Sequence, residues 1–318
     1  MTARNPVAPP PALVWFRRDL RDHDHAALSA ALRTGGAVYC VFVFDTDILD
    51  ALPSRRDRRV HFIHGSLQAL DAALRARGGA LIVRHGRAVQ HIPALAQALA
   101  VGAVHANRDY EPAAKARDQA VAHALAPLGI ALHLHKDQVV FDGGAVRTRA
   151  GTPFTVFTPY KNAWRQRLLQ HTSPHAPPDE LPDLAAHPCA GPIASPPPHL
   201  STGIPTLADI GFEATNLPEL GITPGMPGAR ALWESFAQGR IQRYAQLRDY
   251  PARRGVSYLS VHLRFGTIAI RELVRHALAL RADAWLDELI WRDFFFMILD
   301  HFPHVVERAF KPAYDAIE

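Results

Sequence analysis

Short apolar runs alternate with amphipathic stretches along about the first 140 residues of the chain. Runs of four to eight apolar residues suit strands buried on both faces of a sheet, whereas apolar residues at three- and four-residue intervals suit helices. The expected strands are residues 12–16, 37–44, 80–83, 103–106 and 131–134, and the expected helices are residues 26–32, 61–77, 89–99 and 113–128. This alternation, with glycines in the connections, predicts a parallel, doubly wound α/β sheet.

The pattern changes between residues 174 and 227, where 13 of the 26 prolines fall and little periodicity survives. This stretch is expected to be a connector that wraps over the first domain, because it keeps apolar residues that can be buried. These are Leu200, Ile204, Leu207, Ile210, Phe212 and Leu220. After Gly228 the pattern is helical to the end, most clearly at residues 229–238, 269–280 and 284–302.

We therefore expect three regions. Residues 11–140 form an α/β domain, residues 141–228 form a closing segment and the proline-rich connector, and residues 229–318 form an all-α region.

The composition indicates a soluble, folded protein and adds little beyond that. The 318 residues are 48% hydrophobic, and the formal net charge of +5 with a pI near 9.5 is compatible with a polyanionic partner. Cys40 and Cys189 lie far apart, which indicates neither a disulfide framework nor a thiolate metal site. No metal site is expected. The chain has no secretory signal pattern and no membrane-length apolar run, so a cytoplasmic location is expected.

The loop after the first strand reads Arg17-Arg-Asp-Leu-Arg21 and lacks the Gly-x-Gly-x-x-Gly pattern of dinucleotide sites. Ligands of such sheets bind at the carboxyl ends of the strands. The charged loop could meet an anion there or pair internally, and we expect internal pairing.

One stretch near the end of the chain, residues 286–296, has the composition of a site. On a helix Glu288, Trp291 and Arg292 fall at i, i+3 and i+4 and share one face. That face could hold a ligand. The residues alone favour an ordinary amphipathic helix, with a packed Trp and solvated charges.

A second candidate lies between Tyr244 and Ser260. Gly255, Ser257 and Ser260 could form a phosphate cradle, with Ser260 capping a helix. The alternative is a simple helix cap beside a solvated basic loop, and the residues alone favour it.

Together these stretches resemble the DNA photolyase and cryptochrome family, over nearly the whole chain. The resemblance rests on five ordered motifs. They are residues 13–25, the Tyr110-Glu-Pro112 segment with Arg117-Asp118, residues 154–164, residues 244–260 with Arg248-Asp249-Tyr250-Pro251, and Glu288-Leu-Ile-Trp-Arg292.

The resemblance implies a Rossmann-like antenna domain, a helical FAD-binding domain, and repair of cyclobutane pyrimidine dimers in DNA by an electron from light-excited, reduced FAD. It implies that Glu288 and Trp291 contact the flipped lesion, and that Arg248 meets a DNA phosphate. The FAD contacts that it implies are Tyr244, Val256, Ser257, Tyr258, Leu259, Ser260, Glu288 and Arg292.

Three departures from the family pattern modify these expectations. His25 and Val256 stand where Asn and Thr are usual, and the second change removes one side-chain donor. The residues of the family's folate antenna site are replaced by Ala113, Ala114, Val306 and Glu307. Folate bound in that mode is not expected, while a deazaflavin, another flavin or no antenna stays open.

Family members continue well beyond the point that matches residues 311–318. We therefore expect an incomplete helical domain that exposes apolar helix surface, for example at Leu289 and Phe296. The alternatives to a repair enzyme are a cryptochrome-type signalling flavoprotein and an inactive fragment that retains only the α/β domain. A monomer is expected; lesion type and antenna identity stay undetermined.

Overall fold

The computed structural model describes residues 8–170, 177 and 180–317. The expected connector begins at Pro174, outside the described residues, and the expected helical region ends on Glu318, which also lies outside them. Within the described part of the chain, no helix is both long and apolar enough to cross a bilayer.

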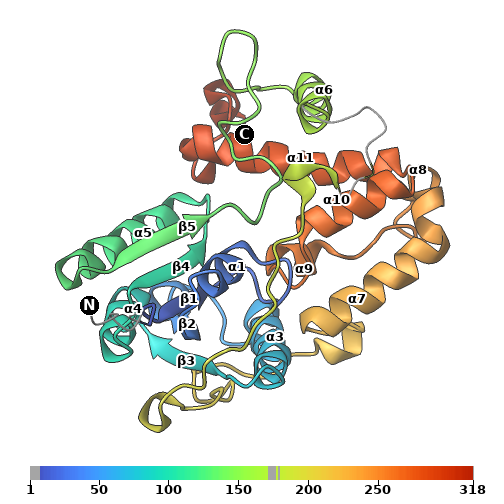
Figure 1. Ribbon diagram of the computed structural model, residues 1–318. Helices are drawn as coiled ribbons and strands as arrows, with labels where there is room; N and C mark the ends of the chain where they lie inside the picture. The colour runs from blue at the N-terminus through green and yellow to red at the C-terminus, as the bar shows by residue number, and fades with distance from the viewer. Residues whose placement is uncertain (1–7, 171–176, 178–179, 318) are drawn as a thin grey trace.

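Five parallel strands form one sheet in the order β3-β2-β1-β4-β5 (Figure 1). They are β1 (Ala12–Phe16), β2 (Val38–Asp45), β3 (Leu81–Gly86), β4 (Ala103–Asn107) and β5 (Ala131–His135). Val14 in the central strand pairs with Cys40 on one side and His105 on the other. The expected parallel sheet is confirmed. The direction in which successive strands are added to the sheet reverses between β1 and β4.

Alternate residues of β1 pack into two different cores, as the two-residue period of a strand requires. Ala12, Val14 and Phe16 pack with α1 (Ala26–Leu32) and α3 (Arg58–Arg75). Leu13 and Trp15 pack with α4 (Ala88–Ala98) and α5 (Pro112–Leu125). Helices therefore cover both faces, and the doubly wound α/β class is confirmed.

Helix ends differ from the expected ones where capping intervenes. The helix expected at 61–77 begins earlier, at Arg58, because the Asp57 carboxylate caps it by accepting the Arg59 N–H at 2.7 Å. The helix expected at 113–128 is α5 followed by a 3₁₀ turn, η1 (Ala126–Leu128). A short helix, α2 (Thr46–Leu49), was not expected.

The proline-rich connector runs as an extended segment over the α/β domain (Figure 1). Ile193, Ile210 and Phe212 are buried in the core on the α1 and α3 face, which confirms the expected wrapping. The connector includes the 3₁₀ turns η3 (Pro182–Leu184), η4 (Pro198–Leu200) and η5 (Pro218–Leu220). Leu220, which the sequence offers as a residue that can be buried, ends the η5 turn and is 49% exposed.

The region after the connector is helical, as expected. It comprises α7 (Gly225–Ser235), a π turn η6 (Phe236–Arg240), η7 (Ile241–Arg243), α8 (Tyr244–Leu247), α9 (Ser260–Arg264), α10 (Ile270–Ala279), α11 (Asp283–His301), η8 (Pro303–Val306) and η9 (Pro312–Ala316). One further helix, α6 (Phe157–Leu168), packs against α11. Its buried residues Tyr160, Trp164 and Leu168 have the four-residue spacing of a helix face.

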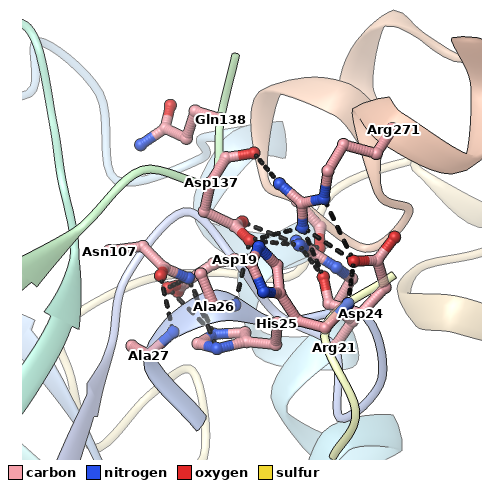
Figure 2. Close-up of polar contacts among 12 residues, drawn as sticks. Asp19, Arg21, Asp24, His25, Ala26, Ala27, Asn107, Asp137, Gln138 and Arg271 are labelled. Atoms are coloured by element: carbon pink, nitrogen blue, oxygen red, sulfur yellow. Dashed lines mark hydrogen bonds and ion pairs between the residues drawn. The ribbon is translucent and has the colours of Figure 1, made fainter. Parts of the chain in front are cut away.

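A buried ion cluster joins the helical region to the α/β domain (Figure 2). Arg271 on α10 reaches the carboxylates of Asp24 at 2.8 Å and Asp137 at 2.9 Å, and Arg21 binds Asp137 at 2.7 Å. Gly266 makes this approach possible, because a Cβ there would lie 2.2 Å from the Arg18 carbonyl oxygen. The cluster therefore fixes how α10 and the loop after β1 face each other.

The remaining charges of that loop also pair internally, as expected. Arg17 binds the Asp118 carboxylate, and Arg18 binds Glu111 at 2.5 Å. His25 acts as the N-cap of α1, since its Nδ1 accepts the Leu28 N–H at 3.0 Å. An imidazole nitrogen thus provides the acceptor that an Asn oxygen would otherwise provide, which explains how His fits at this position.

Candidate functional site

A pocket of about 420 Å³ lies along α11, where that helix faces the α/β domain. Its lining residues are Glu111, Arg264, Glu288, Trp291, Arg292, Phe295, Phe296 and Leu299. Six of the eight come from α11 at helical spacing, so one face of this helix forms most of the wall. The structure thus brings together Glu288, Trp291 and Arg292, as the sequence spacing predicted.

Glu288 is held by a cation from a neighbouring helix. The Arg248 Nη1 donates to Glu288 Oε1 at 2.5 Å, and the Arg248 guanidinium also lies 5.9 Å from the Tyr244 ring centroid. Burial raises the pKa of Tyr244, and the nearby Glu288 carboxylate adds to this. Tyr244, Arg248 and Glu288 therefore form one connected group, although the first two come from α8 and its C-cap and the third from α11.

Arg292 is the second charged residue of α11 in the pocket wall. It donates to the carbonyl oxygens of Gln138 and, at 3.4 Å, Leu263, and its guanidinium lies 4.5 Å from the centroid of Phe296. Burial lowers the pKa of Arg292 to about 10, which leaves it a cation at neutral pH. The pocket wall thus carries a fixed positive charge.

The next residue, Asp293, points away from the pocket and anchors α11. Its Oδ2 accepts the Trp164 indole N–H at 3.0 Å and the backbone N–H groups of Val140 and Phe141 at 3.1 and 3.2 Å. These partners lie more than 120 residues away in the chain. Asp293 therefore sets the position of the pocket-lining face of α11.

The predicted phosphate cradle is only partly as expected. Ser260 does not cap α9: it is the first residue within that helix, and Leu259 is the N-cap without a side-chain hydrogen bond. The Ser257 hydroxyl instead accepts the Leu259 N–H at 3.4 Å, and the positive φ of Tyr258 (60°) turns the chain between them. The expected capping role of Ser260 is therefore wrong.

The side chains of the cradle differ in exposure. Leu259 is 1% exposed, so its side chain is core, whereas Tyr258 is 45% exposed and Ser260 is exposed. Val256 is half-buried, and Arg240 donates to its carbonyl oxygen at 2.5 Å. Arg240 and Arg254 lie 5.9 and 6.0 Å from the Tyr258 ring centroid, which gives this loop two cations.

The expected exposure of apolar helix surface is wrong at Leu289. This side chain is 4% exposed, because its face of α11 packs into the helical core. Phe296 is half-buried, with its ring edge-to-face on Tyr110 at 5.1 Å. The most exposed aromatic ring of the helix is Phe295, at 60%.

Several pocket residues were missed by sequence reasoning. Phe295 and Phe296 continue the helical spacing of the Glu288 face, so the sequence contained a signal for them. The sequence contained no such signal for Glu111 and Arg264. Glu111 comes from a loop of the α/β domain and Arg264 from α9, and both are distant from the Glu288 face in the chain. Arg264 and Arg18 both bind Glu111, at 3.1 and 2.5 Å, which links the two parts of the protein beside the pocket.

Comparison with known proteins identifies the family. The family model described as DNA photolyase matches residues 12–182, which is more than half of the chain. A deoxyribodipyrimidine photo-lyase of Halobacterium salinarum is 35% identical, over 96% of this chain and 65% of its own length. An uncharacterized 31.6 kDa protein of Synechococcus sp. (strain PCC 6716) is 38% identical, over 89% of this chain and 98% of its own length.

Solved structures agree. A bacterial class III photolyase from Agrobacterium tumefaciens has a TM-score of 0.82 at 27% identity, covering all of this chain and 64% of that one. An archaeal photolyase from Sulfolobus tokodaii, described with two FAD molecules, has a TM-score of 0.75 at 25% identity, covering 97% of this chain and 64% of that one. The chain thus spans just under two thirds of the length of these photolyases. With the family model matching more than half of its residues, the chain belongs to the DNA photolyase family.

Proposed function

We propose that the protein takes part in light-driven repair of cyclobutane pyrimidine dimers in DNA, with reduced FAD as its cofactor. The observation that supports this most directly is the pocket along α11, where Glu288, Trp291 and Arg292 lie together. A carboxylate, an aromatic ring and a half-buried cation around one apolar space suit a planar ligand with polar edges. Family membership and the FAD of the Sulfolobus relative point to the same chemistry.

The residues of the predicted cradle fit a flavin nucleotide in their chemistry. The hydroxyls of Ser257 and Ser260 and the cations Arg240 and Arg254 are groups that bind phosphate oxygens. Tyr244, Val256, Tyr258 and Leu259 belong to the same proposed contact set, together with Glu288 and Arg292 of α11. Reduced FAD, when bound, supplies the electron that splits the cyclobutane ring after light absorption.

The side chains of the pocket are proposed to hold and orient the lesion. Glu288 would accept a hydrogen bond from a base edge, and Trp291 would provide an apolar aromatic wall. Arg248 would bind a DNA phosphate. Because Arg248 now neutralises Glu288, its transfer to a phosphate would release Glu288 for the base.

Folate bound in the family's usual mode is not part of this proposal. Ala113 and Ala114 have no side-chain donors or acceptors, and Val306 is a 59% exposed apolar residue followed by an acidic one. A different antenna, or none, is consistent with these residues.

Repair itself is the first test. The 318-residue chain, supplied with FAD and a reductant, is expected to restore thymines from a dimer-containing oligonucleotide under blue light and not in the dark, measured by chromatography. Glu288→Gln should lower the repair rate about 10- to 100-fold, because a hydrogen bond to a charged group contributes about 1.5–3 kcal/mol. Glu234→Gln, a change to an exposed residue of α7, is the matched control. Persistence of the dimers with flavin bound and reduced would contradict the proposal.

Arg248 gives a second test through salt dependence. Arg248→Ala is expected to weaken DNA binding similarly for damaged and undamaged oligonucleotides at low salt. It should also reduce the slope of log K against log salt by about one, since one phosphate contact is lost. Fluorescence anisotropy between about 50 and 200 mM salt measures this slope. An unchanged slope would remove Arg248 from the proposed DNA contacts.

A further inference from the structure

Three aromatic rings line the pocket along α11, and they differ in how much of each ring is free for a ligand. Trp291 stacks on Phe157, with ring centroids 3.6 Å apart and planes within 7°. Phe295 also stacks on Trp291, at 5.3 Å and 23°. Phe294 adds an edge-to-face contact at 5.5 Å, so the indole of Trp291 already has three aromatic partners.

Phe296 is also occupied. The Arg292 guanidinium lies 4.5 Å from its centroid, and Tyr110 meets it edge-to-face at 5.1 Å. A planar ligand would have to displace the half-buried Arg292 guanidinium to reach that face of the ring. Phe296 is thus better placed to hold Arg292 than to meet a ligand.

Phe295 is the remaining ring, and it is 60% exposed at the pocket wall. Exposure of the free part of a large aromatic side chain beside a pocket costs hydrophobic free energy that a stacked ligand would recover. We propose that Phe295 is the stacking surface for a planar heteroaromatic ring in this pocket, with Trp291 and Phe157 as its backing. The inference rests on the proposed function and adds a ligand-contacting residue to it.

The backing is held firmly. Phe157 begins α6, which is tied to α11 by the Trp164 to Asp293 hydrogen bond at 3.0 Å and by the Lys161 to Asp287 ion pair at 2.8 Å. A row of three stacked rings therefore extends from α6 to the pocket surface: Phe157, Trp291 and Phe295. A stacking surface supported in this way needs little reordering when a ligand binds.

The test compares Phe295→Leu with Phe295→Trp in the complete 318-residue chain, in the dark. The ligands are FAD, a dimer-containing oligonucleotide and its undamaged counterpart, and affinity is measured by anisotropy and flavin fluorescence. Phe295→Leu is expected to weaken binding of FAD or of the dimer oligonucleotide about 5- to 100-fold, as loss of one stacked ring does. Phe295→Trp should retain wild-type affinity. Tyr314→Leu, which removes a 57% exposed ring outside the pocket, is the matched control and should change nothing.

The experiment distinguishes whether the stacked ring belongs to a base or to the flavin. It also distinguishes failure of this inference from failure of the proposed function. A loss confined to the dimer oligonucleotide identifies a base as the stacked ring, and a loss confined to FAD identifies the flavin; either supports the inference. Wild-type affinity of Phe295→Leu for both ligands, in a protein that itself binds them, would overturn the inference and leave the proposed function standing. Failure of the wild-type chain to bind either ligand would overturn both. Unchanged thermal midpoints show that the variants are folded.

Discussion

Replacing Arg271 by alanine is expected to lower the free energy of unfolding by about 3–5 kcal/mol. Arg271, Arg21, Asp24 and Asp137 are each at most 6% exposed, and the two arginines balance the two carboxylates. Burial alone would raise the pKa of Asp137, yet the guanidinium groups of Arg21 and Arg271 hold it well below its ordinary value. Without Arg271, Asp137 keeps its ion pair with Arg21, but Asp24 keeps only a longer contact to Arg275 at 3.5 Å, so the two buried carboxylates lose much of their neutralisation.

Urea denaturation at neutral pH measures this loss. Arg271→Lys should fall between wild type and alanine, because an ammonium group keeps the charge but cannot bind Asp24 and Asp137 in a fork. Arg230→Ala is the matched control: this arginine forms an exposed ion pair with Glu234, and its removal should leave the urea midpoint where it was. A midpoint for Arg271→Ala equal to that of Arg230→Ala would show that the cluster is not needed for stability.

As the pH rises from about 4 to above 6, the free energy of unfolding of the wild-type protein is expected to fall relative to that of Asp293→Asn. Burial raises the pKa of Asp293 to about 6, even though the Trp164 indole and two backbone N–H groups favour the charged form. Over this window the folded state retains a proton that the unfolded chain has lost, so stability falls with rising pH. A pKa change of about two units corresponds to about 3 kcal/mol across the window.

The prediction concerns the difference between the two proteins, since other groups titrate in the same range. Burial lowers the pKa values of His105, His135, His187 and His262 to about 4, and these groups act with the opposite sign in both proteins. Urea midpoints at pH 4, 5, 6 and 7 give the difference. Trp164→Phe removes a donor to the carboxylate and should move the window to higher pH. Parallel pH curves for wild type and Asp293→Asn would refute the assignment.

The order of strands and helices was predictable because each element has its own local period. The run from Ala12 to Phe16 is apolar throughout, and it proved to be a central strand with a core on each face. The same reasoning could also have predicted α6, because the spacing of its buried residues Tyr160, Trp164 and Leu168 is that of a helix face. Leu220 shows the opposite case: an apolar residue in a connector indicates that burial is available, not that it occurs.

The candidate site was predictable only along one helix. The spacing of Glu288, Trp291 and Arg292 placed three side chains on one face, and the structure adds Phe295 and Phe296 to the same face. For Ser260 the local pattern was misleading, because a hydroxyl near a glycine turn suggested a helix cap. The left-handed backbone conformation of Tyr258 instead places Leu259 at the N-cap of α9.

By itself, the sequence determined the α/β class, the helical second region, the wrapping connector and the polar face of α11, since all of these follow from spacing within a few residues. Only the tertiary structure decided what that face meets. Phe157 stacks on Trp291, Glu111 lines the pocket along α11, and Arg271 binds Asp137, all across separations of more than 100 residues. Such pairings depend on how whole elements pack, and no local period of the chain encodes them.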